Sequence, residues 1–206
     1  MATATTDRHT QARDQQLITD LSKALLKSAL PGELDGFDEI ARGEAATFLV
    51  EAIAQRVPGT PSLRLESVAQ GRRFMRLAIV NDDMPFLVDS VASTVTAHDL
   101  SIDRVLHPVL SVRRDGDGQL VGLPEDDDCA RRESVIYMEI ERADARQRRA
   151  LLDELQSVLG DVRAAVEDWP LMQRAMRADA DRLPDGEGAA LLRWFLDGNF
   201  TQLGAE

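Results

Sequence analysis

The spacing of apolar residues between positions 62 and 159 constrains the fold of this chain more than any other feature. From Ser62 apolar and polar residues alternate, and a second β-prone run follows over 74–80, which predicts two strands joined as a hairpin. Val88, Val91 and Val95 then recur at helical spacing. This stretch therefore begins with a predicted hairpin that is followed by a helix.

The pattern continues with further strands and ends in a helix. Ile102–Val112 is an apolar run, and its Pro108 cannot donate to a β-ladder, which predicts a sheet edge or a bulge. Asp115–Gly118 is typical of a hairpin turn. The predicted elements after it are strands over 119–123 and 135–140 and a helix that opens at Asp144 and ends at Gly160.

The resulting order from 74 to 159 is strand, helix, strand, strand, strand, helix. It predicts an α+β fold with a ferredoxin-like arrangement, in which an antiparallel sheet carries the helices on one face. Helical segments flank it on both sides, with stop signals at Pro31 and Pro58 before it and a break or kink at Pro170 after it. We divide the chain into a disordered start plus helical preface (1–60), the ferredoxin-like domain (61–160) and a helical extension leading to an unfinished segment (161–206).

Composition excludes several classes of protein. The 206 residues carry a net charge of −12, which opposes binding to nucleic acid. No apolar run reaches the roughly 18 residues of a membrane-spanning helix, and the start lacks the features of a secretory signal, so we expect a cytoplasmic protein. The single cysteine, Cys129, excludes an internal disulfide and every multi-cysteine metal site.

The sequence lacks the common motifs of catalytic and cofactor sites. It has no G-x-G-x-x-G at a helix entrance, no P-loop, no H-E-x-x-H and no G-x-S-x-G. The three histidines are scattered, and His107, beside Pro108, is expected to make a structural hydrogen bond. We therefore predict no catalytic, cofactor-binding or metal-binding residue in this chain.

The most informative local feature is the turn Asn81-Asp82-Asp83-Met84, which joins a strand to a helix whose first turn contains Asp89. The free N–H groups of a helix N-terminus can hold a carboxylate, and nearby acids can hold an ammonium group. These five residues are thus a candidate site for a small amino-acid effector. The alternative is that Asp82 or Asp83 simply caps the helix.

Several longer motifs are spread over the chain. They are Arg56–Pro61, Asn81–Val91, His107–Val109, Arg113–Asp115 with Gly118, Val166–Pro170, Leu192–Leu196 and Asn199–Gly204. Together they resemble the N-terminal region of the large NAD-specific glutamate dehydrogenases of bacteria. The string DDMPFLVDSV, which starts at Asp82, is long enough to be specific.

This resemblance implies both a fold and a place within a larger enzyme. The enzymes of that family are several times longer than this chain, and their N-terminal part resembles ACT domains, which are ferredoxin-like modules that often pair and bind amino acids between them. Their catalytic lysine and dinucleotide-binding fold lie further along the chain, whereas this sequence contains only Lys23 and Lys27. The resemblance therefore implies NAD as cofactor of the parent enzyme and none for this chain.

Three hypotheses follow. The leading one is a non-catalytic regulatory and assembly segment of an enzyme that oxidises glutamate to 2-oxoglutarate and ammonia. Its partners would be the remainder of that chain, further copies in a homo-oligomer and a small amino-acid effector. The second is a stand-alone amino-acid-binding sensor, and the third is a small enzyme that uses Asp82, Asp83 or Asp89 as acid and base.

Overall fold

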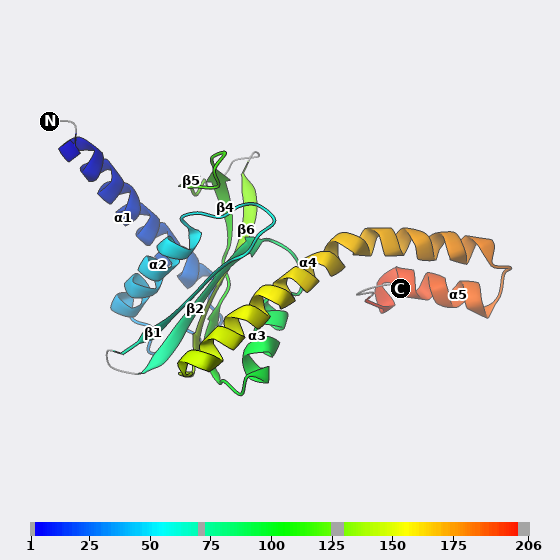
Figure 1. The fold of residues 1–206 in the computed structure, drawn as a ribbon. Helices are drawn as coiled ribbons and strands as arrows, with labels where there is room; N and C mark the ends of the chain where they lie inside the picture. Colours follow the sequence, from blue (N-terminus) through cyan, green and yellow to red (C-terminus); the bar gives the residue numbers. More distant parts are fainter. Residues whose placement is uncertain (1–2, 70–72, 125–129, 202–206) are drawn as a thin grey trace.

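Six strands form one antiparallel sheet in the computed structural model, which describes residues 3–69, 73–124 and 130–201, with side chains from residue 14 onward (Figure 1). The strands are β1 Ser62–Val68, β2 Phe74–Asp82, β3 Ile102–Leu106, β4 Val109–Arg114, β5 Leu120–Gly122 and β6 Arg131–Ile140. The helices are α1 Thr3–Ser28, α2 Glu39–Ile53, α3 Leu87–Ala97, α4 Ala145–Arg182 and α5 Glu187–Trp194, followed by a π-helical turn, η1 Phe195–Asn199. The predicted α+β class and the predicted antiparallel sheet are confirmed.

Strand β6 lies at the centre of the sheet. It pairs with β2 along one side and with β3 and then β4 along the other, and β2 pairs in turn with β1. The ladder changes from β3 to β4 at His107-Pro108, and the carbonyl of Pro108 accepts a bond from the N–H of Val135 at 3.0 Å. The predicted interruption at Pro108 is therefore confirmed, because a residue without an N–H is tolerated where the ladder breaks.

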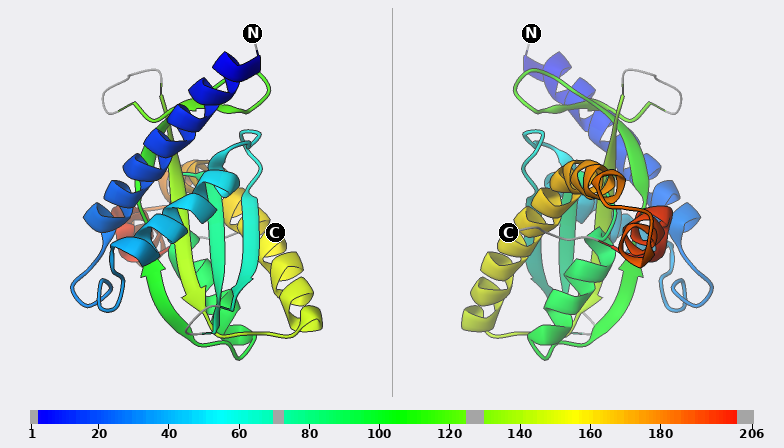
Figure 2. Two further views of the ribbon diagram at one scale, coloured as in Figure 1. Left: turned by 90° about the vertical axis from the view of Figure 1, so that its left-hand side faces the viewer. Right: turned by 90° about the vertical axis from the view of Figure 1, so that its right-hand side faces the viewer.

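Helices cover both faces of the sheet. On β2, Ala78 and Val80 pack with α1 and α2, whereas Leu77 and Ile79 pack with α3 and α4. Figure 2 shows α1 and α2 in front of the sheet in its left view, and α3 and α4 in front of it in its right view. The expected one-sided helical layer thus holds for α3 and α4, and the helical preface covers the opposite face.

The outer edge of the sheet curls toward the connection between α2 and β1. The N–H of Leu120 donates to the carbonyl of Ala54, and the N–H of Arg56 donates to the carbonyl of Gly118, each at 2.9 Å. The predicted turn over 115–118 produces this contact, since Gly118 has a φ of +79° that glycine adopts without strain. This curl brings the β4–β5 turn against the α2–β1 connection.

Two expectations about helix boundaries are wrong. Helix α4 continues through Gly160 to Arg182, because one exposed glycine costs a helix only about 1 kcal/mol and good helix formers surround it. Helix α1 begins at Thr3, where we expected a disordered start, because adding residues to an existing helix is far less costly than starting one.

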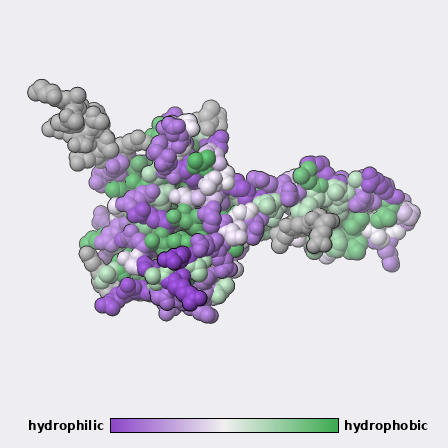
Figure 3. Space-filling view, viewed as in Figure 1, coloured by the Kyte–Doolittle hydropathy of each residue, from purple (hydrophilic) through white to green (hydrophobic). Residues whose placement is uncertain are grey.

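The second half of α4, α5 and η1 form a projecting arm, which we define as residues 170–199 (Figure 1). Pro170 lies inside α4, and Met172, Ala180 and Ala189 are buried where α4 and α5 pack together. Figure 3 shows apolar surface along the arm. Several large apolar side chains on or next to the arm are exposed: Trp169, Leu171, Leu183, Leu191, Trp194 and Phe200. No helix in the described ranges combines the length and apolar composition needed to cross a bilayer.

Candidate functional site

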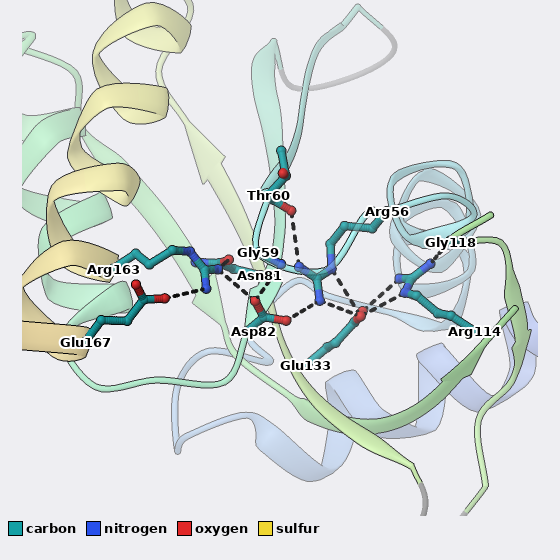
Figure 4. Close-up of polar contacts among 10 residues, drawn as sticks. All are labelled: Arg56, Gly59, Thr60, Asn81, Asp82, Arg114, Gly118, Glu133, Arg163 and Glu167. Atoms are coloured by element: carbon teal, nitrogen blue, oxygen red, sulfur yellow. Dashed lines mark hydrogen bonds and ion pairs between the residues drawn. The ribbon is translucent and has the colours of Figure 1, made fainter. Parts of the chain in front are cut away.

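Charged side chains meet in the interior where the α2–β1 connection, β2 and β6 come together (Figure 4). Arg56 is 3% exposed and Glu133 is fully buried. The Nη2 atom of Arg56 lies 2.7 Å from Oε1 of Glu133 and 2.6 Å from Oδ1 of Asp82. One buried guanidinium therefore joins the ends of two neighbouring strands.

A second arginine completes the environment of Glu133. Arg114 on β4 donates from Nε and Nη2 to the two oxygens of Glu133, at 2.8 and 2.7 Å. This two-point pairing matches the planar guanidinium to the planar carboxylate and is among the stronger hydrogen-bonded arrangements in proteins. The remaining nitrogen, Nη1, donates to the carbonyl of Gly118 at 2.8 Å, so that Arg114 also holds the β4–β5 turn.

The carboxylate of Asp82 links this centre to α4. Its Oδ2 atom accepts from the N–H of Gly59 at 3.0 Å and from Nη2 of Arg163 at 2.8 Å. Arg163 also donates to Oδ1 of Asn81 at 2.7 Å. Because α4 continues past Gly160, it contains Arg163, and this arginine ties α4 to the sheet. We call Arg56, Asp82, Arg114, Glu133 and Arg163 the ion-pair network.

The arginines keep both acids of the ion-pair network ionised. Burial alone would raise the pKa of Glu133, but hydrogen bonds from Arg114 and Arg56 outweigh it, and the pKa lies below its ordinary value. Burial opposes ionisation of Asp82 in the same way, and Arg56 and Arg163 lower its pKa. A general acid or base must exchange its proton near the working pH. Asp82 does not meet that requirement, and its contacts suit a structural clamp.

The five residues of the predicted effector site have different contacts in the structure. Asn81 and Asp82 meet at Arg163, whereas Asp83 lies 3.3 Å from Nε of Arg132. Met84 packs against the core between the sheet and the α3–α4 layer. Asp89 lines a groove between α3 and α4. Only Asn81 and Asp82, of these five, have a shared partner among these contacts, which is Arg163.

Neither aspartate caps α3. The residue before the helix is Phe86, whose φ is +71°, and no side chain caps this N-terminus. The capping alternative is therefore wrong, because the chain needs four residues after Asp82 before it enters the helix. The amide Nδ2 of Asn81 is buried and has no hydrogen-bond partner among the described residues.

Sequence reasoning missed most of the ion-pair network. Arg56 and Arg114 lie in the motifs that carry the family resemblance, but nothing local distinguishes Glu133 or Arg163 from surface charges.

Among the described residues no group of three or more His, Cys, Asp or Glu side chains could hold a metal ion. Cys129 and the acids at 125–128 lie outside those residues. His107 contacts the hydroxyl of Ser134 through Nε2, as expected of a structural histidine.

Comparison with known proteins identifies the family. The model of the family described as "Glutamate dehydrogenase, ACT1 domain" matches residues 21–155, which include the whole sheet and four of the five residues of the ion-pair network. The chain belongs to this family. An NAD-specific glutamate dehydrogenase of Halomonas elongata is 34% identical over 146 residues, and one of Pseudomonas aeruginosa is 36% identical over 144 residues. Each alignment covers 62% of this chain, which spans only 9% of the length of either relative.

The ACT1 domain should lose stability in acid through the two carboxylates of the ion-pair network. Their folded-state pKa values lie below the ordinary values of roughly 3.9 for Asp and 4.3 for Glu. Their contribution to stability is therefore complete above those ordinary values, and it is lost as the pH falls through the lower, folded-state values. Urea unfolding at a series of pH values from about 6 down to about 3 should show this loss.

A matched variant isolates the network's share of the acid response. Glu133→Gln removes one of the two titrating groups, so its unfolding free energy should fall less steeply with decreasing pH than that of the parent domain. If the unfolding free energy fell equally steeply with pH in the two proteins, Glu133 would not contribute to the loss of stability in acid.

Proposed function

We propose that this ACT1 domain is a non-catalytic regulatory and assembly module of an NAD-dependent glutamate dehydrogenase. The observation that carries the proposal is the family match over residues 21–155, together with relatives that are named NAD-specific glutamate dehydrogenases and are far longer than this chain. The parent enzyme would oxidise glutamate to 2-oxoglutarate and ammonia in the cytoplasm. Its NAD and catalytic residues would belong to the remainder of its chain.

We infer a ferredoxin-like unit over residues 61–160, flanked by segments 1–60 and 161–206. The support is the antiparallel order of β2, β6 and the β3–β4 pair, with α3 following β2 and α4 following β6. Strand β1 pairs with β2 at one edge of the sheet. In a ferredoxin-like fold this edge position is occupied by the last strand. An N-terminal strand would thus replace the usual C-terminal one.

The assembly role is supported by the projecting arm. Trp194 and Phe200 are half exposed and stack with Phe195, in an acidic chain that buries most of its other large apolar side chains. Exposed apolar patches of this kind mark interaction surfaces. We propose that the arm packs on the remainder of the dehydrogenase chain or on other copies within a homo-oligomer.

The regulatory role would use the turn after β2. Asn81 offers a buried amide without a partner among the described residues, which suits the carboxylate of an amino acid, and Met84 follows three residues later in the chain. Because Asp82 is committed to Arg56 and Arg163, the ammonium group would pair with Asp83 or Asp89. The stand-alone sensor remains the alternative, and no observation favours it over the module.

A thermal melt against a panel of amino acids tests the regulatory role. An effector at about 100 times its Kd should stabilise the fold by about 2.7 kcal/mol and raise the melting temperature selectively. Asp83→Asn combined with Asp89→Asn should abolish that rise, whereas Asp185→Asn, at the exposed tip of the arm, should leave it unchanged. Asp82 is a poor target for this test because its substitution also breaks the ion-pair network.

Two outcomes contradict the proposal. A flat panel would contradict effector binding by this domain. Robust glutamate-dependent reduction of NAD by the chain alone would contradict its non-catalytic role, and that assay needs no assumption about an effector.

A further inference from the structure

A groove of about 820 Å³ lies between α1 and the corner where β3 gives way to β4. One face of α1 lines it with Asp20, Lys23, Ala24, Lys27 and Ser28. The opposite wall and floor come from 107–111 and 123–124, and they include His107 and the apolar side chains of Leu110 and Leu123. The groove therefore combines charged groups on one side with an apolar wall on the other, as small-molecule sites commonly do.

The charge of this groove is opposite to that of the whole chain. Lys23 and Lys27 are the only lysines in the sequence, and both line it. Its one acid, Asp20, lies 3.9 Å from Nζ of Lys23, so the lining carries a formal charge of +1 in a chain of −12. A local positive field in an acidic protein concentrates anions at that place.

Two other grooves in the described part of the chain have linings of the opposite charge. The α3–α4 groove is lined by Asp89, Glu154 and Asp161 without any lysine or arginine. The groove beside α2 and β1 has three glutamates and Arg76. The positive lining between α1 and β4 is therefore not a general property of the surface.

The spacing of the two lysines indicates what kind of anion fits. Residues four apart on a helix lie about 5–6 Å apart on the same face, and each lysine bears its ammonium on a flexible four-carbon stem. Two such cations can each meet one end of a short molecule that has two carboxylates. The apolar wall of Leu110 and Leu123 can cover the carbon chain between those ends.

The floor of the groove adds polar character without a competing charge. His107 is half buried, and burial lowers its pKa, so its ring is neutral at pH 7. Asp83 is the acid that acts on His107 electrostatically, and it does not line the groove. A neutral imidazole can donate a hydrogen bond to a carboxylate while the lysines supply the charge.

We propose that this groove is a binding site for a small dicarboxylate, held by Lys23 and Lys27. This site is separate from the effector turn after β2 and does not depend on it. Lysine ammonium groups would hold the carboxylates, and Asp20 would limit the affinity by pairing with Lys23 when the groove is empty.

Carbon-13 reductive methylation followed by NMR provides a direct test, because in these 206 residues it labels only the two lysines and the N-terminal amine and keeps their charge. Titration with succinate should move both lysine signals along one saturable curve. The N-terminal signal serves as an internal control, and sodium chloride of equal ionic strength serves as the control for screening. Succinate shifts no larger than those with chloride would overturn the proposal.

Variants and other anions test the assignment further. Lys23→Gln and Lys27→Gln should each weaken succinate binding about tenfold, the effect of losing one charged hydrogen bond. Arg146→Gln, which removes an exposed cation at the start of α4, should leave it unchanged. Acetate should bind more weakly than succinate. Saturation by inorganic phosphate but not by succinate would overturn the dicarboxylate assignment.

Discussion

Replacing Glu133 with alanine is expected to lower the free energy of unfolding by about 3–5 kcal/mol, the usual cost of breaking a buried ion pair by removing one partner. Glu133 is fully buried and accepts all its hydrogen bonds from Arg56 and Arg114. Among the described residues, its loss leaves Arg114 with no acid partner and Arg56 with Asp82 alone. Urea denaturation at pH 7 would measure the loss as a lower midpoint with an unchanged slope.

Two further variants separate the network from an ordinary surface charge. Glu167→Ala removes an exposed acid 3.7 Å from Arg163 and should change stability by less than about 1 kcal/mol. Combining Glu133→Leu with Arg114→Met should cost less stability than Glu133→Ala. The double variant removes the arginine of β4 together with its acid, so this arginine is not left buried without a partner. If Glu133→Ala cost no more than Glu167→Ala, the ion-pair network would not hold the fold together.

Replacing Gly118 with alanine is expected to destabilise the domain by about 3 kcal/mol, through backbone strain and a steric clash together. Gly118 has a φ of +79°, and a Cβ atom there would lie 2.5 Å from the carbonyl oxygen of Arg56. The backbone must move, which weakens the bonds that the carbonyl of Gly118 accepts from Arg56 and Arg114. The melting temperature should fall by roughly 10 °C.

Gly36→Ala is the matched control for this substitution. Gly36 also has a positive φ, +69°, but its added Cβ would meet no atom within 4 Å. Alanine there adds only the strain of the left-handed conformation, about 1 kcal/mol. Equal losses in the two variants would show that the contact between Gly118 and Arg56 is not tight.

Some errors in reading the sequence have a common cause. Gly160 is a reasonable helix end by itself, but its cost to a helix is only about 1 kcal/mol, and Arg163 in the continued α4 gains contacts with Asn81 and Asp82 on the sheet. Likewise, Asp82 looks like a helix cap by position and instead pairs with arginines 26 and 81 residues away. In both cases a long-range contact outweighed a local preference.

The sequence by itself determined the kinds of elements and their order. Each of these elements follows from residues that are close together in the sequence. Examples are the alternation from Ser62, the interruption at Pro108 and the turn before Gly118. Only the tertiary structure decided that α1 and α2 cover the second face of the sheet and that Glu133 lies between Arg56 and Arg114. The reason is that strand order and curl, which no local pattern encodes, bring charges distant in sequence together, and burial then makes their pairing necessary.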